Sequence, residues 1–233
     1  MPPSARSSFL YKIVGALLLV GLVMLWTIKS MVPNIVAAGR RTSEEAAVSR
    51  LRELLWAEDR IREAGAIDRD GDGRGEYAFL GELMGQGSGK AKVAQPPLQP
   101  GRFREVKPGV YRGEGYGFVV YLPAAGGGGA IEGGADQADA ATARDRFIAY
   151  AFPIEGPGAG RRLFYIDQDE RVCEATIADG DPTSPGAPSW NAALPPGARS
   201  IDAISDCGPG GDGHLWRPWR HKKARPPRSP STP

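Results

Sequence analysis

The hydrophobic pattern of the chain begins with one long apolar segment near the N-terminus. Residues 13–28 (IVGALLLVGLVMLWTI) contain no charged side chain, and residues 9–11 lengthen the segment when Lys12 extends its ammonium group toward the membrane interface. About 20 apolar residues are enough for a helix to cross a hydrocarbon layer of ~30 Å. Residues 9–28 therefore predict a single transmembrane anchor.

A cleaved signal peptide is the alternative interpretation of this segment. A basic start precedes the apolar run, and Ala37 and Ala38 offer small residues of the kind found at cleavage sites. The run is longer than a usual signal core, and Ala38 lies far beyond its end, which favours an anchor. Basic residues flank the segment on both sides, so the positive-inside rule does not decide its orientation.

A second helix is predicted directly after the anchor, over residues 43–64. Thr42 and Glu45 have the spacing of a capping box, and Pro33 marks either a kink in one longer helix or a break between two. Apolar residues recur at helical spacing at Leu51, Leu54, Leu55 and Ile61. This helix therefore has one apolar face, which we expect to pack against the rest of the domain.

Downstream, the pattern changes to that of short strands. Four runs rich in β-branched and aromatic residues are bounded by Gly, Pro or Asp: residues 117–122, 146–152, 162–166 and 170–177. The stretch 124–143, with four consecutive glycines, is expected to be a mobile loop. The fold class predicted is α+β: a long N-terminal helix, first transmembrane and then amphipathic, on a small antiparallel sheet. Thirty-two glycines and 21 prolines among 233 residues make it loop-rich.

Charge divides the chain into an acidic body and a basic end. The first 31 residues carry three basic residues, residues 217–228 carry six, and neither segment contains an acid. Residues 32–212 therefore hold the other 20 basic residues and all 27 acidic ones, a net charge of −7. We expect a short tail at 1–8, the anchor at 9–28, an α+β domain at 32–212 and a basic, proline-rich tail at 213–233. Such a tail is typical of disordered, solubilising ends, although its tryptophans also suit an acidic polymer or anionic lipid. A nucleic acid is not the partner we expect.

The most distinctive motif is acidic and follows the predicted second helix. Asp68, Asp70 and Asp72 alternate before Gly73, which reproduces the first half of a calcium-binding loop. The twelfth position, where such loops place a bidentate Glu, is Phe79. Two interpretations stay open: a solvated turn that ends the helix, and a calcium site formed by the three aspartates with Glu76.

The two cysteines, Cys173 and Cys207, lack the spacing of a zinc site. A disulfide between them requires an oxidising compartment, which favours an exported domain, and two unpaired buried thiols are the alternative. The only histidines, His214 and His221, lie in or beside the basic tail, so a nucleophilic catalytic site has little support. No spacing among the acids singles out a catalytic pair.

The order of these segments resembles the pilin-like proteins of type IV pili and type II secretion systems. The segments are the apolar helix, its continuation LRELLWAEDRIREAGAIDRDGDGRGEYAFLGEL, and the runs GEGYGFVVYLP, IAYAFP and GRRLFYIDQDERV. The resemblance covers about residues 10–178. The resemblance implies a long helix lying on a small antiparallel sheet, with a disulfide in the C-terminal region. The chain departs from the family at the prepilin peptidase site, because no acid precedes Glu44. It therefore resembles a relative that stays anchored.

The leading hypothesis is a non-enzymatic, pilin-like envelope protein that contributes to an assembly or scaffold. It implies a single pass through the inner membrane, with the C-terminal domain in the periplasm or outside the cell. Other pilin-like subunits or components of the cell envelope are the partners it implies. A membrane-anchored, calcium-dependent binding module and an envelope hydrolase are the alternatives.

Overall fold

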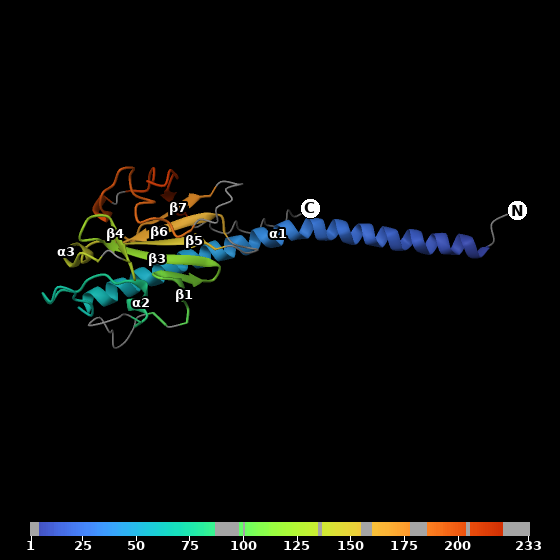
Figure 1. Cartoon of the computed structure of the whole chain (residues 1–233). Coiled ribbons are helices and arrows are strands. Elements are labelled where there is room, and N and C mark those ends of the chain that lie inside the picture. Colours follow the sequence, from blue (N-terminus) through green and yellow to red (C-terminus); the bar gives the residue numbers. More distant parts are fainter. Residues whose placement is uncertain are drawn as a thin grey trace, which may run out of the picture.

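A computed structural model describes the chain over residues 5–86, 98–99, 101–134, 137–154, 160–177, 186–203 and 206–220. For residues 5–16, 28, 30, 33 and 34 it describes the backbone only. Figure 1 shows one long helix, whose C-terminal half lies in a folded head and whose N-terminal half extends away from it. The head consists of the described residues from Glu44 onward.

Helix α1 runs from Ala5 to Glu63 without interruption, so the apolar segment and the amphipathic helix are one element that continues past Pro33. Among the side chains that the structure describes, no helix combines the length and the apolar character needed to cross a membrane. The predicted anchor lies partly outside those side chains, because residues 9–16 and 28 are described by their backbone alone.

The C-terminal half of α1 packs as its sequence pattern predicts. Leu51 and Leu54 are completely buried, and Ile61 is 3 % exposed. They belong to a core shared with Phe118 and Phe164 of the sheet. Fully burying one leucine side chain stabilises the fold by about 1.5 to 3 kcal/mol, so this face fixes the helix on the sheet.

The head contains an antiparallel sheet with eight strands in the described part of the chain. The strands are β1 (Arg104–Lys107), β2 (Val110–Gly113), β3 (Tyr116–Pro123), β4 (Gly129–Ile131), β5 (Ile148–Pro153), β6 (Arg162–Asp167), β7 (Val172–Thr176) and β8 (Arg217–Pro218). Their order is β1-β2-β3-β5-β6-β7-β8, and β4 pairs with the C-terminal end of β3. Short helices α2 (Leu80–Leu83), α3 (Ala140–Ala143) and η1 (Ile201–Ala203) lie in the connections.

The structure confirms the α+β class, the antiparallel sheet and the four predicted strands, which correspond to β3, β5, β6 and β7. The prediction of a loop over residues 124–143 is wrong in part, since this stretch contains β4 and α3. Gly129 of this stretch serves packing, because a Cβ atom there would lie 2.5 Å from Cβ of Trp190. The Asp139 carboxylate caps α3 by accepting a hydrogen bond from the Ala141 N–H.

The sheet is covered on both faces, which explains why β3 and β5 are buried along their whole length. Helix α1 covers the first face, and a C-terminal segment, described over residues 187–203 and 206–216, covers the second; Figure 1 shows the two on opposite sides. Trp216, which is 1 % exposed, is the largest fully buried side chain of this cover. The fold therefore extends beyond residue 212, the predicted end of the domain, because Trp216 and β8 belong to the head. Residues 221–233 of the predicted tail lie outside the described part.

A disulfide between Cys173 of β7 and Cys207 ties this cover to the sheet. Cys173 is completely buried on the second face, and the two Cα atoms are 6.0 Å apart. The bond closes a loop with a sequence separation of 34 residues. It therefore restricts how far the C-terminal cover can separate from the sheet when the chain unfolds.

We expect reduction of this disulfide to lower the free energy of unfolding by roughly 3 to 4 kcal/mol, the chain-entropy value for a loop of this length. The measurement is a urea unfolding curve of the purified chain, with and without reductant. The variant that combines Cys173→Ala with Cys207→Ala is the control and should not respond to reductant. An unchanged midpoint for the natural chain on reduction would contradict a stabilising disulfide.

Candidate functional site

The acidic motif forms a tight loop between the end of α1 and helix α2. Asp68 organises it: one carboxylate oxygen accepts hydrogen bonds from the N–H groups of Gly71 and Asp72, at 2.7 and 3.1 Å. The other oxygen accepts from the Gly73 N–H at 2.9 Å. Gly71 and Gly73 have φ angles of 78° and 83°, which residues with a Cβ atom rarely adopt. The alternation of Asp and Gly therefore encodes the loop.

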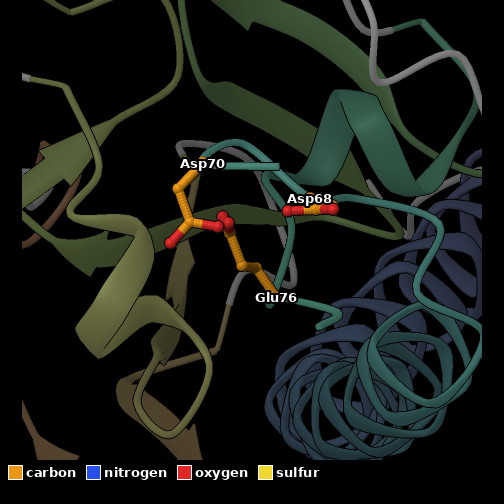
Figure 2. A group of neighbouring side chains, drawn as sticks. All are labelled: Asp68, Asp70 and Glu76. Atoms are coloured by element: carbon orange, nitrogen blue, oxygen red, sulfur yellow. The ribbon is translucent and has the colours of Figure 1, made fainter. Parts of the chain in front are cut away.

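Three carboxylates converge at this loop. One oxygen each from Asp68, Asp70 and Glu76 lies within 4.8 Å of the others, and Figure 2 shows the Asp70 and Glu76 carboxylates pointing toward one another. Glu76 is completely buried, whereas Asp70 is exposed. The loop approaches α1 closely at Gly75, where a Cβ atom would lie 1.9 Å from the Arg62 carbonyl oxygen. Grouped carboxylate oxygens of this kind are the donors that a hard cation such as Ca²⁺ prefers.

Two arginines already interact with these carboxylates. Arg144, at the C-terminal end of α3, approaches both Asp70 and Asp72 with a nitrogen–oxygen distance of 2.6 Å. Arg69 pairs with Glu76 at 2.7 Å and with Glu82 at 2.6 Å. Arg69 also donates its backbone N–H to Glu76 at 2.8 Å. The guanidinium groups offset part of the negative charge that would otherwise attract a cation.

The residues predicted as calcium ligands are therefore divided between two roles. Asp68, Asp70 and Glu76 form the close group, while Asp72 is outside it and pairs with Arg144. The next acid downstream, Glu82, points to Arg69 and accepts a hydrogen bond from the Phe79 N–H at 2.8 Å. Neither Phe79 nor Glu82 supplies the bidentate ligand of a complete calcium loop.

Beyond this loop, the buried Glu58 and the half-buried Glu132 hold the segment that leads into α2. Glu58 of α1 is completely buried and accepts a hydrogen bond from the Ala78 N–H at 2.7 Å. Glu132 accepts from the Gly81 N–H at 2.9 Å and from the Tyr111 hydroxyl at 3.0 Å. Burial raises the pKa of Glu58, Glu82 and Glu132, because surroundings of low polarity disfavour the charged carboxylate. The acidic loop thus continues into a set of carboxyl groups that bind backbone N–H groups.

Several of these residues were missed by sequence reasoning. Arg69 stands inside the motif, so its position between two aspartates was a visible signal of internal ion pairing. Arg144 and Glu132 lie more than 50 residues downstream in regions expected to be a loop or its flank, and no local pattern connects them to the motif. Glu58 stands among the apolar positions of α1, where an acid normally marks an exposed face.

Comparison of the chain with protein-family models, curated proteins and solved structures finds no match.

Glu58 makes stability depend on pH. Its pKa is raised by burial well above the ordinary value of 4.5, so the folded chain retains a proton at pH values where the unfolded chain has released it. The free energy of unfolding should therefore fall as pH rises from 4.5 toward the pKa of the folded state. We expect thermal melting of Glu58→Gln to show a smaller loss of stability between pH 5 and roughly pH 8 than the natural chain.

The matched control is Glu45→Gln, because Glu45 is an exposed glutamate on the same helix. It should keep the pH dependence of the natural chain. Equal pH dependence of the Glu58→Gln and Glu45→Gln variants would show that Glu58 does not titrate in this way.

Proposed function

We propose that the chain is a non-enzymatic, pilin-like envelope protein, held in the membrane by the N-terminal half of α1 and contributing its head to an assembly or scaffold. The observation that carries the proposal is the apolar surface of this half of the helix. Every apolar side chain from Leu17 to Trp26 is at least 55 % exposed, and none of them contacts the head's buried cores. Water is an unfavourable surrounding for such a surface.

The change of character along α1 supports this proposal. From Leu51 to Ile61 the helix has one buried face, as an amphipathic helix on a sheet does. From Leu17 to Trp26 it is apolar on all sides, which is typical of a helix surrounded by lipid or by other helices. The uncharged stretch of residues 13–28 includes this region. A single helix that changes from one pattern to the other suits an anchor that continues into a head.

The disulfide supports a location outside the cytoplasm. Cys173 and Cys207 form a bond that persists in oxidising compartments and is rare in the cytosol. We therefore place the anchor as a single pass in the inner membrane, with the head in the periplasm or outside the cell. Other pilin-like subunits or components of the cell envelope are the partners that this arrangement favours.

Membrane anchoring predicts how the full chain fractionates. The natural chain should remain in the membrane pellet after alkaline carbonate extraction. The variant that combines Leu18→Glu with Leu22→Glu should move to the supernatant, because each charge costs about 2.5 to 3.5 kcal/mol near the middle of a membrane helix. Leu215→Glu is the control, since Leu215 is an exposed leucine of the head, and it should stay in the pellet. Extraction of the natural chain itself would contradict anchoring.

A calcium-dependent binding module is the second candidate, favoured by the convergence of Asp68, Asp70 and Glu76. These residues would provide carboxylate oxygens to the cation, with Asp72 as a nearby fourth acid. The set is incomplete, because Ca²⁺ takes six to eight oxygens and the bidentate Glu is missing. Arg144 also competes for Asp70 and Asp72. The fit therefore supports a weak site, with the remaining ligands provided by water or backbone carbonyls.

Calorimetric titration with CaCl₂ tests this candidate. Arg144→Gln should bind Ca²⁺ about tenfold or more tightly than the natural chain, because it releases two carboxylates from a competing cation. The variant that combines Asp68→Asn with Asp70→Asn should not bind. Arg199→Gln is the control: it removes an exposed arginine of the head that does not contact the acidic loop, and it should leave the affinity for Ca²⁺ unchanged. Lack of Ca²⁺ binding by both the natural chain and Arg144→Gln would exclude the calcium site.

A further inference from the structure

A hollow of about 270 Å³ lies on the second face of the sheet, at its β1–β2 end. Val106 and Val110 line it from β1 and β2, Phe152 lines it from the end of β5, and Ile154 lines it from just beyond that strand. The C-terminal cover closes over the middle of this face, and in its described part only Ala187, together with the preceding Gly186, lines the hollow. Val106 is 48 % exposed, so an apolar part of the sheet remains open there.

Three basic residues lie on the same face of the sheet as this hollow, and one of them, Lys107, lines it. Arg104 of β1 lies directly opposite Arg112 of β2, and Lys107 lies opposite Val110. Directly opposed residues of antiparallel strands share a face, and so do residues two positions apart in one strand. Val110 belongs to the core of the second face, so Arg112 and Arg104 lie on that face as well.

The register connects the arginine pair to the hollow. Arg112 lies opposite Gly117 of β3, which in turn lies opposite Phe152 of β5. The Phe152 ring occupies the space over Gly117, where a Cβ atom would lie 2.3 Å from the ring. The row across the sheet therefore runs from two exposed guanidinium groups to an aromatic side chain that lines the hollow.

The positive charge of this row is not balanced within the described part of the chain. Arg104 and Arg112 form no ion pair there, and like charges directly opposite one another destabilise a sheet. The acids that neighbour the pair in the sequence have other partners: Glu105 accepts a hydrogen bond from the Gly109 N–H, and Glu114 pairs with Arg50. An anionic group from outside the head would remove this repulsion.

Protection of a sheet edge does not explain the pair. Charged residues and a bulge on a short edge strand prevent association between sheets, and β1 has both. Arg112, however, belongs to β2, which is paired on both sides, so its charge does not protect the edge. Because edge protection does not account for Arg112, the arginine pair indicates a binding site for a ligand.

We propose that this surface binds an acidic, extended segment of a partner protein. Carboxylates of the segment pair with Arg104 and Arg112, whose planar guanidinium groups match carboxylate geometry, and one apolar side chain enters the hollow. In the described part of the chain no strand pairs with the outer edge of β1, so its backbone groups are available to an extended peptide. A polysaccharide lacks the apolar side chain that the hollow accommodates, which favours a peptide.

Fluorescence anisotropy of the full chain in zwitterionic detergent tests this proposal with blocked, labelled hexapeptides. A peptide that alternates Glu and Leu should bind, with lower affinity as salt rises, while peptides that alternate Lys with Leu or Glu with Ser should bind at least about tenfold more weakly. The variant that combines Arg104→Gln with Arg112→Gln should lose about tenfold or more in affinity for the Glu–Leu peptide.

Two further variants separate binding at this surface from general attraction. Val106→Asp places a charge at the exposed rim of the hollow and should weaken binding, whereas Arg199→Gln should leave it unchanged. Lack of binding by the Glu–Leu peptide, or full affinity after loss of both arginines, would overturn the proposal. Equal binding of the Glu–Ser peptide or of polygalacturonate would overturn it too, because the surface would then attract any polyanion.

Discussion

The burial of one face of α1 against the first face of the sheet is the interaction on which the rest of the structure depends. Leu51, Leu54 and Ile61 lie in the same core as Phe118 and Phe164 of the central strands. Without the helix, this face of β3, β5 and β6 would expose a continuous row of aromatic and aliphatic side chains. The sheet and the helix are therefore stable only together, and the direction of α1 sets where its apolar half emerges.

The same packing positions the acidic loop. Because α1 ends at Glu63 beside the sheet, the chain must turn back immediately, and the turn is formed by Asp68 with Gly71 and Gly73. Glu58 then holds the returning segment through the Ala78 N–H. The carboxylates at this end serve the fold first, by accepting backbone hydrogen bonds and pairing with arginines. A cation would bind to a loop that is already ordered.

The local elements of this fold could be predicted from the sequence because their signals are local. The spacing of Leu51, Leu54 and Ile61 predicts the packed face of α1, and the aromatic and β-branched runs predict four central strands. Strands β1, β2 and β8 are short and carry charged or proline residues, so their pairing depends on neighbours distant in the sequence. Strand β4 lies in a glycine-rich stretch whose local sequence predicts a loop. Its strand packs under Trp190, which is distant in the sequence.

In the candidate site, too, local features could be predicted and long-range contacts could not. The turn could be predicted from the alternating aspartates, and the clustering of Asp68, Asp70 and Glu76 agrees with that pattern. The partner of Asp70 could not be predicted, because Arg144 is 74 residues away in the sequence and is brought to the loop by the packing of α3 on the head. The arginine pair on β1 and β2 likewise becomes visible only when the strand register places the two residues opposite each other.

Hydrogen–deuterium exchange of the full chain in lipid nanodiscs tests most directly the central claim that α1 is one helix with two different surroundings. We expect two slowly exchanging blocks, residues 17–27 in lipid and residues 47–61 on the sheet, separated by faster exchange over residues 35–43, which are exposed or half-buried. Exchange of residues 17–27 as fast as that of residues 35–43 would contradict it.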